Sequence, residues 1–322
     1  MARRKPAEIH GLLVIDKPRG CTSHDVVDRV RRVLGERKVG HSGTLDPDAT
    51  GVLLVGVGNA TRLLRFLDMV SIDGHMTTLK VYRGSIVLGT ETDSLDSTGS
   101  VTTTHDMQSV IATLTVEKLQ ELVAEKFCGP IMQVPPMVSA IRIDGRRLHE
   151  LAREGIEVER EAREVTVHDI RILSVNDAVI DIEVACSSGT FIRTLAADIG
   201  RALGGGAHLR DLRRTAIGRF SLDEAVTLER LESADTNAAR QQLLPVATCV
   251  RGLSSLLADE DLQAAVAVGK VVTASLFNGE PPWAVLANSP TGEPVLLGVY
   301  EPFANERVGE GMARPLVVLP SH

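Results

Sequence analysis

One segment, residues 37–51, holds residue types that could do chemistry. It places His41 and Asp46, an imidazole and a carboxylate, among three glycines. Glycine lets the backbone turn tightly or come close to a ligand, so Asp46 could act as a nucleophile or base on a bound molecule. Taken alone, Asp46-Pro47 is more typical of a turn. The segment is therefore a candidate site that needs support from elsewhere in the chain.

The elements around this segment must position it. The apolar run 12–16 predicts a buried strand. A helix follows, with Ser23 as its expected N-cap and Gly35 as its stop, because the valines between them fall on one face. Residues 39–50, rich in Gly, Asp and Pro, predict a loop, and residues 51–58 predict a second buried strand.

The rest of the chain mixes strands and helices irregularly. Residues 79–88 and 179–186 predict strands, the latter because Asp181 and Glu183 alternate with apolar residues. Residues 115–127 and 191–203 predict helices. No regular βαβ rhythm is present, so the pattern predicts an α+β fold. After a shift in composition near residues 232–240, the last 75 or so residues predict a small, separate β-rich domain.

Composition excludes several classes of protein. Aromatic residues make up only 3% of the chain, which argues against a broad aromatic platform for single-stranded nucleic acid. The four cysteines form no CxxC pair, so neither a zinc site nor a disulfide scaffold is expected. No apolar run approaches the roughly 18 residues that cross a bilayer. We expect a cytoplasmic protein with no membrane association.

Charge is unevenly distributed along the chain. The net charge is −7, but from Ser221 onward 13 acidic residues face 6 basic ones, which accounts for all of it. Residues 1–65 carry 12 bases against 7 acids, and residues 201–219 carry 5 against 1. These two basic segments could face a phosphate backbone, although on charge alone solvated surface charge is the more common explanation.

The wider motif pattern resembles the TruB family of tRNA pseudouridine synthases. It runs in family order from Leu13 to Gly218. The segments that carry it are Leu13-Val-Ile-Asp-Lys-Pro-Arg-Gly-Cys-Thr-Ser23, Gly40-His-Ser-Gly-Thr-Leu-Asp-Pro-Asp-Ala-Thr-Gly51, Lys80-Val-Tyr82, Leu88-Gly-Thr-Glu-Thr-Asp93, Leu95-Asp-Ser-Thr-Gly99, Gly129-Pro-Ile-Met-Gln-Val-Pro-Pro136, Gly145-Arg-Arg-Leu148, Cys186-Ser-Ser-Gly-Thr-Phe-Ile-Arg-Thr-Leu195 and Leu212-Arg-Arg-Thr-Ala-Ile-Gly218.

This resemblance implies a fold and a reaction. The fold would be that of pseudouridine synthases, a central mixed, largely antiparallel sheet flanked by helices. Residues 1–240 would form the catalytic domain, with an RNA-contacting insertion at about 124–155, and residues 246–322 a PUA-like domain. The reaction would turn uridine 55, in the T loop of the T arm of tRNA, into pseudouridine. It needs no cofactor, metal or protein partner, and we expect a monomer.

The resemblance also implies roles for individual residues. Asp46 would be the catalytic nucleophile, and Arg193 would keep it ionised, as a neighbouring cation does for a carboxylate. Tyr82 would stack on the target base and handle its C5 proton. Leu212 would pack on the same base, and Phe191 would offer a second stacking surface.

The target uridine must leave its stack to be reached, at a cost of a few kcal/mol. The resemblance implies that His41 fills the space it vacates. Lys17 is expected to hold a phosphate, together with arginines near residues 29–38 and 142–153.

Four positions depart from the family's usual pattern. Phe191, His149 and Val138 each replace a common tyrosine, and Arg142 replaces a common lysine. None of them is Asp46, Tyr82 or Arg193. We therefore expect activity to persist, with altered placement of the RNA or base.

Three other functions remain open at this point. The chain could be a tRNA-binding folding chaperone whose catalysis is incidental. It could be a related synthase that modifies guide-selected or other RNA. It could also be a hydrolase with Asp46 and Asp48 as paired carboxylates, although two loop residues this close need not converge on one bond.

Overall fold

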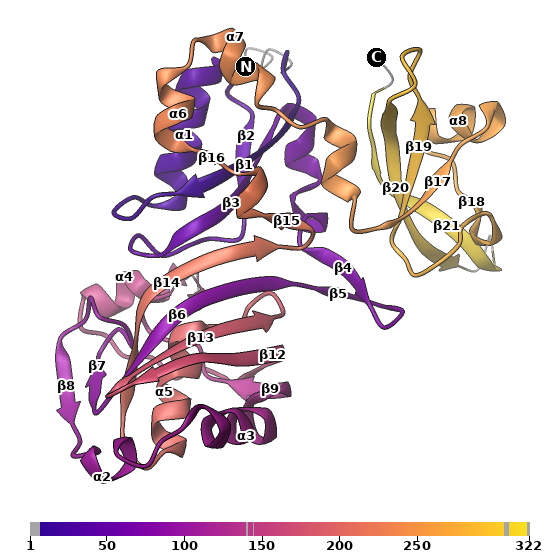
Figure 1. Ribbon diagram of the computed structural model, residues 1–322. Helices are drawn as coiled ribbons and strands as arrows, with labels where there is room; N and C mark the ends of the chain where they lie inside the picture. The colour runs from indigo at the N-terminus through magenta and orange to yellow at the C-terminus, as the bar shows by residue number, and fades with distance from the viewer. Residues whose placement is uncertain (1–6, 140, 144, 306–308, 321–322) are drawn as a thin grey trace. The chain divides into compact units, whose positions relative to one another are not determined.

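The computed structural model describes residues 7–139, 141–143, 145–305 and 309–320. The chain forms two compact units, which differ in how they are assembled from the sequence (Figure 1). Met1–Leu79 and Ala216–His322 together make the first unit, and Lys80–Thr215 makes the second. The first unit therefore joins the two ends of the chain, whereas the second is one continuous segment.

Four strands organise the N-terminal part of the first unit. They are β1 (Gly11–Lys17), β2 (Val39–Ser42), β3 (Thr50–Val57) and β16 (Val226–Thr227). β3 pairs antiparallel with both β1 and β2, and β16 adds to β1 in parallel. β1 and β3 are buried almost throughout, as their apolar sequences predict. This pairing places Lys17 opposite Gly51.

Helix α1 (Ser23–Leu34) covers these strands with an apolar face. Val26, Val27, Val30 and Leu34 are buried against β1 and β3 residues and against α6 (Leu228–Ser233) and α7 (Thr236–Gln241). The helix ends at Gly35, whose φ of +68° suits a residue without a Cβ atom. The expected helix and its stop are thus confirmed.

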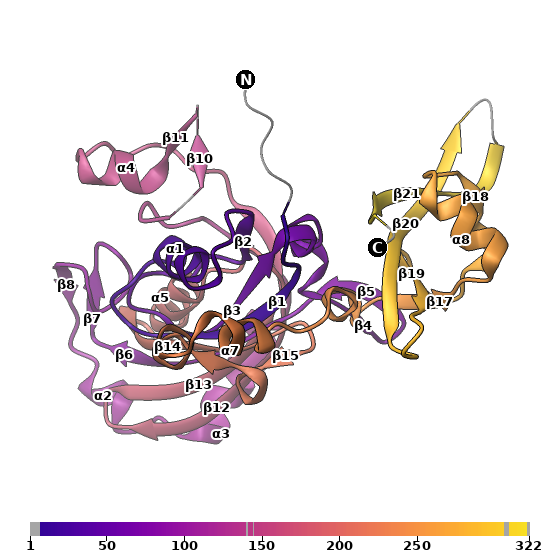
Figure 2. The same ribbon diagram turned by 90° about the horizontal axis from the view of Figure 1, so that it is seen from above.

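The C-terminal part of the first unit is a five-stranded sheet with one helix. Its strand order is β17 (Ser254–Leu257), β19 (Trp283–Asn288), β20 (Pro294–Asn305), β21 (Gly309–Val318) and β18 (Val272–Thr273). Helix α8 (Glu260–Ala267) packs against β20 and β21 (Figure 2). Phe277 stacks on Trp283 with ring centroids 4.8 Å apart and lies 5.8 Å from Tyr300, so three of the chain's few aromatic residues fill one core.

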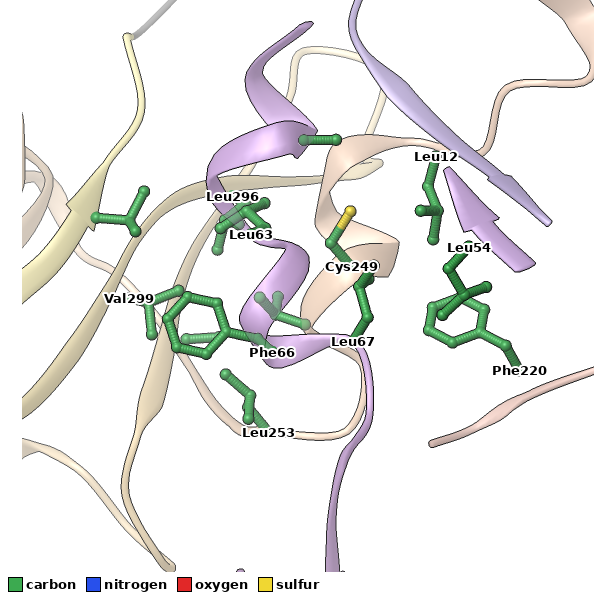
Figure 3. Close-up of a cluster of buried hydrophobic side chains, with 14 of the residues drawn as sticks. Leu12, Leu54, Leu63, Phe66, Leu67, Phe220, Cys249, Leu253, Leu296 and Val299 are labelled. Carbon is green, nitrogen blue, oxygen red and sulfur yellow. The ribbon is translucent and has the colours of Figure 1, made fainter. Parts of the chain in front are cut away.

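A second core joins this C-terminal sheet to the strands at the start of the chain. Leu12 and Leu54 contribute from β1 and β3, Cys249 from the segment between the two parts, and Val299 from β20 (Figure 3). Phe66 lies among them and is 3% exposed. Burial of these side chains stabilises the two parts of the first unit as one body.

Short elements complete the first unit. β4 and β5 form an antiparallel hairpin, and several 3-10 turns link the longer elements. Their bounds are η1 (Gly58–Arg62), η2 (Leu64–Phe66), β4 (Met69–Ile72), β5 (His75–Thr78), β15 (Phe220–Ser221), η3 (Leu222–Glu224), η4 (Val246–Val250) and η5 (Ala274–Leu276).

The second unit is built on antiparallel strands. In order they are β14 (Ala207–Ile217), β6 (Lys80–Leu88), β13 (Val179–Cys186), β12 (Arg163–Asn176) and β9 (Gly129–Gln133). β6 pairs with β13 from Lys80 to Val87, with Tyr82 opposite Val184. The last two residues of β14 belong to the first unit.

Two helices support these strands. α3 (Val116–Phe127) is held to β12 by Gln120, which donates to the carbonyl of Ile170 at 2.7 Å and accepts from the amide of Ile172 at 3.0 Å. α5 (Ile192–Ala202) is buried over most of its length. The unit's remaining elements are β7 (Thr90–Thr92), β8 (Val101–Thr104), α2 (Gln108–Ile111), β10 (Arg142–Ile143), β11 (Arg146–Arg147) and α4 (Leu148–Arg153).

These elements confirm the α+β prediction, with largely antiparallel pairing, flanking helices and a β-rich C-terminal part. Two local predictions are wrong. The N-cap of α1 is Thr22, not Ser23, and residues 39–42 form strand β2 instead of a loop. The two units have other bounds than the expected domains, 1–240 and 246–322, and those domain bounds stay a prediction.

None of the helices among the described residues combines the length and the apolarity that crossing a membrane requires. Within the same residues, no three His, Cys, Asp or Glu side chains gather as a metal site would need.

Candidate active site

The loop of residues 43–49, between β2 and β3, carries Asp46 and is called the Asp46 loop below. Glycines bound it: Gly43 has a φ of +72° and Gly51, at the start of β3, a φ of +103°. A side chain at either position would strain the backbone. Asp46 itself is partly buried. A carboxylate held in a short, fixed loop and still reachable from outside suits a nucleophile.

Lys17 holds the Asp46 loop in place from the end of β1. Its side chain has no exposed surface. The ammonium donates to the carbonyl oxygens of Cys21 at 2.7 Å, of Pro18 at 3.0 Å and of Pro47 at 3.0 Å. Through these bonds Lys17 positions Pro47, the residue that follows Asp46. The expectation that Lys17 also holds a phosphate stays a prediction.

Ser23 holds the other flank of Asp46. It is 1% exposed, and its hydroxyl accepts from the amide of Leu45 at 2.9 Å and faces the Leu45 carbonyl at 3.3 Å. The cap of α1 falls to Thr22, whose hydroxyl accepts from the Asp25 amide at 3.1 Å. Ser23 and Lys17 thus fix the residues immediately before and after Asp46.

His41 lies on β2, opposite Val55 of β3, and is partly buried. Its ring meets that of His24, in the first turn of α1, with centroids 5.2 Å apart and planes at 84°. No motif or periodicity in the sequence indicates His24. Its position next to Ser23 is the one signal that points to it.

Arg193, in the second unit, is 4% exposed at the start of α5. Its guanidinium donates to the carbonyl oxygens of Ser94 at 2.9 Å and Val138 at 2.7 Å. Nε lies 3.7 Å from an Asp96 carboxylate oxygen. The guanidinium is thereby fixed in one orientation, which a lysine could not reproduce.

The loop that receives Arg193 is itself well bonded. One Asp96 oxygen accepts from the hydroxyls of Ser94 at 2.7 Å and Thr98 at 2.6 Å, and from the Thr98 amide at 3.0 Å. This leaves the other Asp96 oxygen to the arginine. Asp96 belongs to a motif noted in the sequence, but its role was not predicted.

Tyr82 lies on β6 and is 8% exposed. The guanidinium of Arg214, from β14, lies 5.9 Å from its ring centroid, and Arg214 has no exposed surface. Burial raises the pKa of the neighbouring Cys186 thiol to about 11, although Lys80 and Arg214 counteract it. Cys186 therefore stays protonated at neutral pH and is no competing nucleophile.

Leu212 and Phe191 flank this part of the second unit. Leu212 follows Asp211, a residue at φ +55°, and would touch a Cβ atom placed on Gly84 of β6 at 3.6 Å. The Phe191 amide donates to the Gln133 side chain at 3.0 Å, and Gln133 is 2% exposed. Both hydrophobic residues are partly buried.

The residues that depart from the family pattern differ in how exposed they are. Val138 is 39% exposed, and its carbonyl serves Arg193 whatever its side chain. Arg142 is exposed on β10. The side chain of His149 lies outside the described part of the structure.

The predicted site residues are divided between the two units. Lys17, His41 and Asp46 belong to the first, and these three gather around the Asp46 loop. The second unit holds the other four, which are Tyr82, Phe191, Arg193 and Leu212.

Comparison with known protein families gives two matches. The N-terminal domain of TruB family pseudouridylate synthases matches residues 31–192. The C-terminal domain of tRNA pseudouridylate synthase B matches residues 193–251. The first match alone covers half of the chain.

Curated relatives agree with these matches. A tRNA pseudouridine synthase B of Syntrophotalea carbinolica is 45% identical over 248 residues, 77% of either chain. One of Corynebacterium diphtheriae is 48% identical over 227 residues, 69% of this chain and 72% of the relative. One of Solibacter usitatus is 40% identical over 290 residues, 89% of this chain and 94% of the relative.

Solved structures show the same fold. A chain of a Cbf5–Nop10–Gar1 complex superimposes with a TM-score of 0.69 at 25% identity, over 96% of this chain and 85% of that one. A chain of an H/ACA ribonucleoprotein with a substrate RNA reaches 0.67 at 23% identity, over 97% and 85%.

Proposed function

This chain belongs to the TruB family of tRNA pseudouridine synthases, and on that premise we propose its target and the roles of its residues. The reaction isomerises a uridine of tRNA to pseudouridine. The proposed target is uridine 55 in the T loop. The observation that supports the mechanism most is the Asp46 loop, where a reachable carboxylate is held on both flanks by buried side chains.

Asp46 is the proposed nucleophile. The reaction breaks the C–N glycosidic bond and joins the ribose to C5 of the same base. A carboxylate can start it by attack or by elimination at the ribose, and must be ionised to do either. Bonds to Leu45 and Pro47 limit the motion of the chain on both sides of Asp46. Restricting the motion of Asp46 favours the reactive orientation of its carboxylate over the many unproductive orientations.

Arg193 is the proposed partner of Asp46. A guanidinium stays protonated at any physiological pH and lowers the cost of an ionised carboxylate in a site closed to water. Its fixed orientation supports this role, because an arginine that only paired with solvent-exposed charge would not be buried. The proposal requires Asp46 and Arg193 to act on the same nucleotide.

Tyr82 and Leu212 are the proposed binding surface of the base. Tyr82 supplies an aromatic face for stacking and a hydroxyl for the proton at C5, and Leu212 packs on the base. Phe191 can add stacking, although it lacks the hydroxyl of a tyrosine. Arg214 beneath Tyr82 keeps this face electropositive, which suits a pyrimidine with two carbonyl oxygens.

His41 is the proposed contact with the RNA around the vacated position. A flipped uridine leaves a gap in the T loop, and filling it offsets part of the lost stacking. The partly buried ring of His41, at the entry to the Asp46 loop, is close enough to the nucleophile in sequence for this role.

The matched pair Asp46→Asn and Asp48→Asn tests the mechanism. Both residues lie in the same loop, and Asp48 is exposed. With unmodified tRNA transcript, Asp46→Asn should lower the single-turnover rate by on the order of 1000-fold or more while binding tRNA normally. Asp48→Asn should leave both unchanged. Pseudouridine formed at the wild-type rate by Asp46→Asn would overturn the proposal.

Mapping of the product tests the target. Sequencing chemistry specific for pseudouridine should place it at position 55 in the transcript. A transcript with cytidine at this position should remain unmodified. Rescue of a deletion strain by Asp46→Asn would separately show that tRNA folding assistance, not the modification, is what the cell needs.

A further inference from the structure

Two histidine rings meet beside the Asp46 loop. The ring of His24 stands edge-on to that of His41, with centroids 5.2 Å apart and planes at 84°. Helix α1 and strand β2, which carry them, are in contact (Figure 2). His24 is exposed, and the proposed mechanism gives it no task.

The position of His24 is tied to the Asp46 loop through its neighbour. Ser23 is buried, and its hydroxyl bonds both backbone groups of Leu45. On the other side, Thr22 and Asp25 cap each other reciprocally, with the Thr22 amide donating to Asp25 at 2.8 Å. The first turn of α1 therefore cannot shift without disturbing the residue before Asp46.

The position of the His41 backbone is equally fixed. It is paired with Val55 in the centre of the β2–β3 ladder. The direction of its ring is set by two side-chain torsions. An edge-to-face neighbour selects among these directions, and such ring pairs contribute beyond the area they bury.

We propose that His24 is a positioning residue for His41. It holds the His41 ring in the direction in which that ring enters the tRNA, and Ser23 couples this direction to the placement of Asp46. The start of α1 thus sets both the RNA contact and the nucleophile. This inference rests on the proposed role of His41.

The contact depends on a ring, so substitutions can separate it from other effects. His24→Ala removes the ring, and His24→Phe keeps an aromatic edge without a titratable group. His75→Ala is the matched control, because His75 is an exposed histidine of the same unit on β5. A double-mutant cycle with His41→Ala then tests whether His24 acts through His41.

The experiment uses the full chain and unmodified tRNA transcript, with single-turnover rate, tRNA affinity and Tm measured for each variant. His24→Ala should slow pseudouridine formation by about threefold to tenfold. Its Tm should match that of wild type. His24→Phe should restore most of the rate, and His75→Ala should behave as wild type. In the His41→Ala background, His24→Ala should cause no further slowing.

Each contrary result has a defined meaning. Equal slowing by His24→Ala with and without His41 means that His24 acts alone, which overturns the inference. An impaired His41→Ala beside an unimpaired His24→Ala overturns the inference and leaves the role of His41 standing. An unimpaired His41→Ala removes that role and the inference together.

Discussion

The ammonium of Lys17 donates to the carbonyl oxygen of Pro47 across 3.0 Å, inside the protein. The bond ties the end of β1 to the residue after the proposed nucleophile. A charge buried this way is costly unless its donors are all used, and here two more carbonyl oxygens accept from it. The cost is offset by the fixed position of the loop.

Replacing Lys17 by methionine should therefore affect both stability and rate. Three carbonyl oxygens would lose their donor, so we expect a loss of about 2–4 kcal/mol in the free energy of unfolding. The single-turnover rate should fall more than tRNA affinity does, because Lys17 is buried and bonds the backbone next to Asp46. Urea unfolding and a binding assay check both. Lys38→Met is the control, because Lys38 is exposed. A selective loss of tRNA affinity in Lys17→Met would contradict the positioning role of Lys17.

The two hydroxyls at the start of α1 should behave differently. Ser23→Ala leaves the Leu45 amide without its acceptor next to Asp46, and should slow the reaction as well as destabilise the fold by about 1–3 kcal/mol. Thr22→Ala removes only the helix cap, at about 1 kcal/mol, with the rate constant nearly unchanged. The comparison is of single-turnover rates at a temperature where both variants are folded. Equal rates for Ser23→Ala and Thr22→Ala would show that Ser23 does not position the Asp46 loop.

Arg193→Lys should keep the positive charge but lose the fixed orientation of the guanidinium. An ammonium cannot donate to Ser94, Val138 and Asp96 from one place, so we expect a rate reduction on the order of 100-fold, with tRNA binding retained. Arg83→Lys is the control in the same unit. Arg83 is 59% exposed and pairs with Glu183 at 2.7 Å, and its substitution should leave the rate as it is.

The buried thiol of Cys249 should make stability depend on alkaline pH. Burial raises its pKa from 9.0 to about 12 in the folded protein. The folded state therefore keeps a proton that the unfolded chain releases, and stability is lost as pH rises from about 9 towards 12. By pH ~10 the loss should reach about 1 kcal/mol. Tm measured against pH under reducing conditions should fall less steeply for Cys249→Ala; parallel curves would contradict this.

The sequence predicted the elements with strong apolar patterns and missed those without. β1, β3, β13 and α1 lie where their periodicity put them. Strand β14 was not predicted, because charged residues interrupt its apolar pattern. Its place beside β6 depends on pairing between residues far apart in the chain. β2 was not predicted as a strand, because its sequence holds a glycine and lacks the alternation of apolar and polar residues. It forms a strand through its pairing with β3.

The site shows the same limit at the level of single residues. Residue types and motifs led to Asp46, Tyr82 and Arg193 as catalytic candidates, and their roles stay predictions. They could not show that Lys17 is buried, since a lysine after a strand is usually exposed. Either Thr22 or Ser23 could cap α1 by its chemistry, and the bond from Ser23 to Leu45 decides between them. Such choices depend on tertiary contacts that no local pattern encodes.

The assembly of the first unit from both chain ends has a consequence for synthesis on the ribosome. Lys80–Thr215 emerges as one stretch, with all strands and helices of its unit available. The core around Leu12 and Leu54 must wait for Cys249 and Val299, which are synthesised much later than β1 and β3. Until then, β1 and β3 present an apolar surface that invites chaperones. The emergence of Val299, not that of the Asp46 loop, should mark when the nascent chain first resists a protease at its N-terminal strands.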